Sequence, residues 1–121
     1  MRALLEARGS QYHPGGSDPE RRFLRVLEVA GLPAPVPQHR VVIKGRTFRL
    51  DGAYPDLMIG VEFDGFDYHT SRSDFDYDRE RDRLLELAGW LMLHFTSRTP
   101  DAVIVRDVSE ARRLRSHDPS K

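Results

Sequence analysis

The feature that most constrains the fold is an almost uninterrupted apolar run from Leu57 to Phe63. A run of this length, without the alternating polar residues of a half-exposed strand, is typical of a strand buried on both faces in the centre of a sheet. It contains one charged residue, Glu62. We therefore expect a central strand here. Because burying an unpaired carboxylate is costly, we expect Glu62 to have a role beyond that of an ordinary surface residue.

Cap, turn and periodicity signals place the other elements around this strand. Ser17 and Glu20 have the spacing of a capping box at the start of a helix, which Gly31 ends. Apolar runs predict further strands over residues 41–43, 47–53 and 90–95, and helical patterns predict helices over about 75–88 and from Pro100 towards Arg115. The expected fold is therefore α/β (α+β), with the order α-β-β-β-α-β-α.

A length of 121 residues predicts one domain with a modest core. Glycines, prolines and serines predict a linker over residues 1–16, the domain over 17–116 and a frayed tail over 117–121. The absence of cysteine excludes disulfides, thiolate zinc sites and cysteine nucleophiles. No apolar stretch approaches the ~20 residues of a membrane span. We expect a soluble cytoplasmic protein, with no membrane partner, which can belong to a longer parent protein.

The formal charge of zero hides an uneven distribution. Residues 1–50 contain nine Lys and Arg against four Asp and Glu, whereas residues 51–82 contain three against ten. An acidic centre flanked by basic segments suits a metal site that serves a polyanionic substrate. A solvated acidic helix and a few surface arginines would give the same distribution, so charge leaves both interpretations open.

Two carboxylates interrupt apolar strands that follow each other in the chain. Asp51 lies on the second predicted strand and Glu62 on the third. Successive strands usually pair, so these side chains can approach each other and bind Mg²⁺ or Mn²⁺. Such a cation can polarise a phosphate and activate water. Taken alone, the aspartate also fits a turn cap and the glutamate a surface residue.

An ordered set of motifs resembles a known family. The set comprises Leu32 to Gln38 with the pattern Leu-Pro-x-Pro-x-x-Gln, Arg49-Leu50-Asp51, Tyr54-Pro55-Asp56, Glu62-Phe63-Asp64-Gly65, Tyr68-His69 and Gly89-Trp90. Over residues 17–110 it resembles the domain-of-unknown-function 559 group of the PD-(D/E)XK nuclease superfamily, which is related to very-short-patch-repair (Vsr) endonucleases. The resemblance implies a restriction-endonuclease-like core, with a mixed four-stranded sheet flanked by helices, and Mg²⁺-dependent hydrolysis of double-stranded DNA.

The resemblance also implies roles for individual residues. Asp51 and Glu62 match the two metal carboxylates, and Asp64, which would assist or hold a second ion, stands where the motif usually has lysine. His69 matches a histidine that orients or deprotonates the attacking water, a role that a near-neutral pKa allows. Glu20 resembles a helical glutamate that joins the metal site in many members, although its capping role is a sufficient explanation.

Three further residues are candidates for phosphate contacts. Gln38 precedes the first predicted strand and fits either a contact to phosphate or water or a plain loop amide. Arg72 and Arg81 belong to the charged helix and can supply the positive charge that the motif lysine would provide. Arg81 differs from its neighbours because it lies on the mostly apolar stripe of that helix.

The missing lysine leaves two hypotheses. The two lysines of the chain, Lys44 near a hairpin tip and Lys121 at the C-terminus, cannot replace it by position. The first hypothesis is an active, Vsr-like, metal-dependent endonuclease. The second is a catalytically inactive nuclease-fold module that binds nucleic acid or protein within a larger defence or toxin–antitoxin protein.

Overall fold

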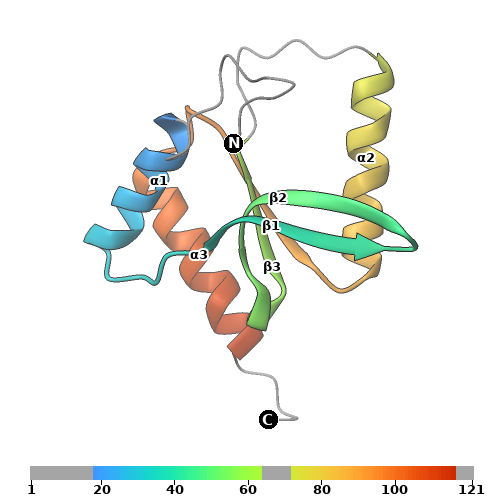
Figure 1. The fold of residues 1–121 in the computed structure, drawn as a ribbon. Helices are drawn as coiled ribbons and strands as arrows, with labels where there is room; N and C mark the ends of the chain where they lie inside the picture. Colours follow the sequence, from blue (N-terminus) through green and yellow to red (C-terminus); the bar gives the residue numbers. More distant parts are fainter. Residues whose placement is uncertain (1–17, 64–71, 117–121) are drawn as a thin grey trace.

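A computed structural model describes residues 18–63 and 72–116. It is an α+β structure with one mixed four-stranded sheet flanked by helices in the order α-β-β-β-α-β-α, which confirms the predicted fold class. Helices α1 and α3 lie side by side against one face of the sheet, and α2 lies on the other side (Figure 1). The elements are α1 Asp18–Val29, β1 Val36–Ile43, β2 Arg46–Tyr54, the 3₁₀ turn η2 Pro55–Leu57, β3 Ile59–Phe63, α2 Arg72–Leu87, β4 Leu91–Phe95 and α3 Asp101–Ser116.

The strands are ordered β1-β2-β3-β4, so β3 is flanked by a strand on each side. It pairs with β2 in antiparallel fashion and with β4 in parallel fashion. The side chains of Ile59 and Val61 are fully buried. The predicted central position of this apolar run is therefore confirmed. The strand begins at Ile59 rather than Leu57, because Pro55–Leu57 forms a 3₁₀ turn and Met58 adopts a left-handed conformation.

β1 and β2 form a long antiparallel hairpin. Its turn residues Lys44 and Gly45 both have positive φ, of 53° and 77°, which matches the twist of a two-residue hairpin loop. β1 begins at Val36, five residues before the predicted start at 41. The physical reason is the partner strand: Val36 pairs with Ala53 near the end of β2, so the ladder extends through residues whose own sequence does not favour a strand.

The sheet separates two apolar cores. On the first face, Phe23 and Leu27 of α1 pack with Val61 and with residues of α3. On the second face, Leu85 of α2 packs with Leu50 and Trp90. Trp90 is 8% exposed and therefore belongs to this core.

Two side chains on the second face approach Gly60 of β3 so closely that they leave no room for a larger residue. A Cβ atom on Gly60 would lie 2.6 Å from Met92 Sδ and 2.9 Å from Leu50 Cδ1. Real Cβ atoms essentially never come this close, so any larger residue would displace these two side chains. The glycine therefore lets the second core close directly onto the central strand.

None of the helices within residues 18–63 and 72–116 is long and apolar enough to cross a membrane. α1 begins at Asp18, in agreement with the predicted helix start. Ser17 of the expected capping box, the expected linker 1–16 and the expected tail 117–121 lie outside the described residues.

Candidate functional site

Asp51 and Glu62 lie on neighbouring strands, as the sequence predicts. Gly52 of β2 pairs with Val61 of β3, and the next position in this antiparallel register places Asp51 opposite Glu62. Asp51 Oδ2 accepts a hydrogen bond of 2.8 Å from the backbone N–H of Phe63. The aspartate therefore lies where β2 and β3 stop pairing, and its carboxylate reaches the end of the central strand.

The Glu62 carboxylate is held in an environment that disfavours its charge. The residue is 6% exposed, and it is the one buried charged residue among those the structure describes. Burial, followed by the charge of Asp51, raises the pKa of Glu62 to about 8 from an ordinary value of 4.5. Arg81, the backbone of Asp51 and His94 lower the pKa but do not cancel these effects. An ionised Glu62 thus needs a positive partner.

Arg81 of α2 supplies part of that positive charge. Its Nη2 lies 3.5 Å from Glu62 Oε1 and 3.5 Å from Asp82 Oδ1, and its side chain is 15% exposed. The position of Arg81 on the apolar stripe of the helix directs it towards the sheet, as expected. The guanidinium is therefore shared between a buried glutamate and a partly exposed aspartate.

His94 and Asp82 are neighbours of the site that the sequence analysis did not single out. His94 pairs with Glu62 in the parallel register of β3 and β4, and its Nε2 lies 3.4 Å from Asp82 Oδ2. The histidine interrupts the apolar run Leu91–Phe95 in the same way that Glu62 interrupts its own strand. A polar residue within an apolar run thus marks His94 in the sequence as a candidate functional residue. The contact with Asp82 depends on how α2 packs on the sheet, which residue spacing does not reveal.

The donor set fits a hard divalent cation. Glu62 Oε2 is buried and has no hydrogen-bond partner among the described residues, while Asp51 presents a second carboxylate beside it. Mg²⁺ and Mn²⁺ are commonly bound through one or two carboxylates, with water and phosphate oxygens completing the shell. Within the described ranges, no group of three or more His, Asp or Glu side chains could hold a metal ion. Asp51 and Glu62 are therefore a pair of carboxylates rather than a complete set of three acidic or histidine ligands within residues 18–63 and 72–116.

The other predicted site residues are placed as follows. Gln38 lies on β1, at the register position across from Asp51, and is partly buried. Glu20 lies in the first turn of α1 and is partly buried. Arg72 is the first residue of α2, and its side chain is not among the described ones. Asp64 and His69, expected next to the metal, lie outside the described residues.

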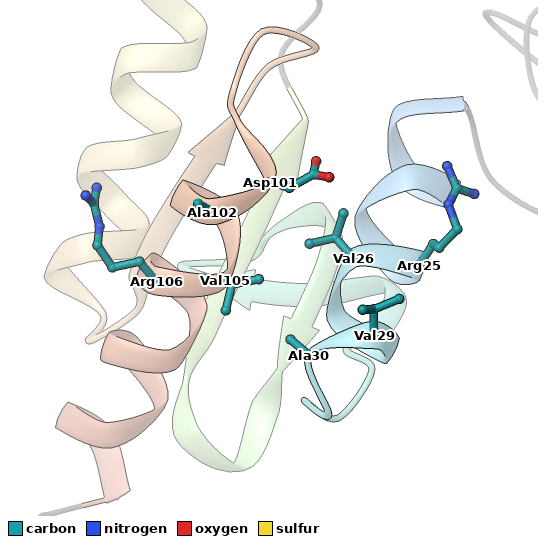
Figure 2. Close-up of a pocket in the computed structure, with 8 residues that line it drawn as sticks. All are labelled: Arg25, Val26, Val29, Ala30, Asp101, Ala102, Val105 and Arg106. Atoms are coloured by element: carbon teal, nitrogen blue, oxygen red, sulfur yellow. The ribbon is translucent and has the colours of Figure 1, made fainter.

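An open groove lies on the other side of the sheet from these carboxylates. It runs between α1 and α3, has a volume of about 560 Å³ and is lined mainly by aliphatic side chains such as Val26, Val29 and Val105 (Figure 2). The carboxylate at its edge, Asp101, binds Arg22 at 3.0 Å. The groove contains no pair of carboxylates, so we do not assign it to the metal chemistry.

Comparisons with protein-family models, curated proteins and solved structures found no match for this chain. The function is therefore inferred from two sources. One is the geometry around Glu62, and the other is the ordered set of motifs in the sequence.

Proposed function

We propose that this chain is a metal-dependent nuclease domain that hydrolyses phosphodiester bonds in double-stranded DNA, with Asp51 and Glu62 as ligands of Mg²⁺ or Mn²⁺. The observation that carries the proposal is the burial of Glu62 beside Asp51, with one carboxylate oxygen that has no partner in the part of the chain that the structure describes. A purely structural ion pair with Arg81 accounts for Oε1 alone. The other oxygen would remain desolvated without compensation, which a bound cation would remedy.

Each residue of the proposed site has a separate chemical role. Asp51 and Glu62 would hold the cation, which would supply Lewis acidity and lower the pKa of a bound water. Arg81, already within 3.5 Å of Glu62, provides a fixed positive charge that can stabilise the phosphate in the transition state in place of the usual lysine. Asp64 and His69 keep the roles that the resemblance implies, as an additional ligand and as the group that acts on the attacking water.

A non-catalytic module is the second candidate, and one observation favours it. Asp51 accepts the N–H of Phe63 and thereby closes the end of the β2–β3 ladder, while Arg81 faces Glu62. Each carboxylate thus has a structural partner without any metal. On this hypothesis the fold is retained to bind nucleic acid or protein, and neither carboxylate needs to bind Mg²⁺.

Nicking of supercoiled plasmid DNA in Mg²⁺ and in Mn²⁺ tests the proposal. We expect Asp51→Asn and Glu62→Gln to reduce the rate on the order of 100-fold or more, because each removes charge that holds the cation. Asp56→Asn is the matched control, since this aspartate is exposed in η2 and should leave the rate unchanged. Absence of nicking by the wild-type chain in both metals would contradict catalysis and favour the non-catalytic module.

A further inference from the structure

Two buried side-chain oxygens have no hydrogen-bond partner in the part of the chain that the structure describes. They are Glu62 Oε2 and Gln38 Oε1. Native proteins leave few buried polar atoms unpaired, because each costs about 1–3 kcal/mol of stability. When Glu62 is ionised, both atoms are acceptors only, so neither can satisfy the other. A shared positive partner would satisfy both.

The sheet register places both residues next to Asp51. Gln38 falls between Pro37, which pairs with Gly52, and His39, which pairs with Leu50, so the β2 residue across from it is Asp51, although the two do not form a ladder pair. The continuation of the β2–β3 register makes Asp51 the partner of Glu62 as well. The three residues therefore occupy one row across three adjacent strands.

The backbone at Gln38 also departs from a regular strand. Its φ is 52°, a conformation that is uncommon for a residue other than glycine. This conformation interrupts the β1–β2 ladder at the position opposite Asp51, where the structure records no pairing between Pro37 and His39. Gln38 therefore lies at an irregular point of β1, in the strand position across from Asp51.

We infer that Gln38 supplies a third oxygen ligand to a divalent cation held by Asp51 and Glu62. The inference rests on the proposed function, and it assigns the amide to the cation rather than to a phosphate. A glutamine carbonyl is a neutral oxygen donor, which is suited to hard cations and adds no further repulsion to a site with two carboxylates.

Mn²⁺ binding to the full chain, measured by calorimetry, tests the assignment. We expect Gln38→Met, which keeps the side-chain length but removes the oxygen, to weaken binding roughly tenfold. Gln38→Asn keeps the amide but withdraws it by one methylene, and should also weaken binding. Val42→Met is the matched control, because Val42 is 67% exposed on the same strand and the variant should bind Mn²⁺ like the wild type.

Thermal melting gives a second readout that does not depend on activity. Without metal, Gln38→Met should melt at the wild-type temperature or above, since it removes an unpaired buried acceptor. With Mn²⁺ the wild type should gain more than the variant, because ligand binding stabilises the folded state. A purely structural glutamine would give the opposite result, with a lower melting temperature in the metal-free variant.

The outcomes separate this inference from the proposed function. Equal Mn²⁺ affinity in the wild type, Gln38→Met and Gln38→Asn would overturn the role of Gln38 and leave the Asp51–Glu62 site standing. Absence of Mn²⁺ binding by the wild-type chain would overturn both. A tenfold loss confined to the Gln38 variants would support the assignment.

Discussion

Replacing Glu62 with glutamine should stabilise the metal-free protein at alkaline pH. The pKa of this carboxyl in the fold is raised to about 8 from 4.5, so the folded state keeps a proton that the unfolded chain loses above about pH 4.5. Where the folded state binds more protons, the free energy of unfolding falls as pH rises. The loss therefore accumulates between pH 4.5 and about 8 and is constant above that.

The magnitude follows from the width of the pH window. One pKa unit corresponds to about 1.4 kcal/mol, so between pH 5.5 and 8 the wild type should lose on the order of 3 kcal/mol that a non-titrating glutamine does not lose. At pH 5.5 the carboxyl is neutral in the folded state but ionised in the unfolded chain, so about 1.4 kcal/mol of the loss is already present. At pH 8.5 the stability advantage of Glu62→Gln over the wild type should be about 3 kcal/mol larger than at pH 5.5.

Urea denaturation in the presence of a chelator measures this difference at both pH values. Trp90 is the single tryptophan and is 8% exposed, so its fluorescence reports the loss of the core around it. Glu110→Gln on the exposed face of α3 is a control that should keep the wild-type slope with pH. A stability difference between Glu62→Gln and wild type that is the same at pH 5.5 and pH 8.5 would refute the reasoning.

Three further predictions concern the scaffold and are checked by denaturant unfolding. Tyr54→Phe removes a buried hydroxyl that donates a 2.7 Å hydrogen bond to the Pro33 carbonyl, so it should cost about 1 kcal/mol, and a cost near zero would contradict the bond. Gly60→Ala forces a Cβ against Met92 and should cost roughly 1–3 kcal/mol; an unchanged midpoint would argue against the close approach. Arg46→Gln breaks an exposed ion pair with α2 and should cost less than about 1 kcal/mol, whereas a larger loss would indicate that the hairpin tip anchors that helix.

Local sequence patterns predicted the elements of the fold because hydrophobic burial imposes those patterns. The apolar run that contains Ile59 and Val61 is buried because it has a strand on each side and helices over both faces. β1 was predicted too short because its first half is held by the ladder with β2, and a residue such as Pro37 gives no local strand signal. Pairing across strands, rather than propensity, sets that boundary.

The site was predictable where a polar residue interrupts an apolar pattern. Asp51 and Glu62 on their strands and Arg81 on its helical stripe all carry this signal, and the structure brings the three together. His94 carries the same signal but was not singled out. Its contact with Asp82 required the parallel β3–β4 register and the packing of α2 on the sheet, both of which are tertiary features.

Anomalous scattering from a crystal soaked in Mn²⁺ tests the central claim most directly. The account predicts a single strong peak within about 2.0–2.3 Å of one oxygen of Asp51 and of Oε2 of Glu62. The same soak of Asp51→Asn should weaken or remove the peak. A wild-type crystal that takes up Mn²⁺ elsewhere, with no peak between these carboxylates, would contradict the claim that they form a metal site.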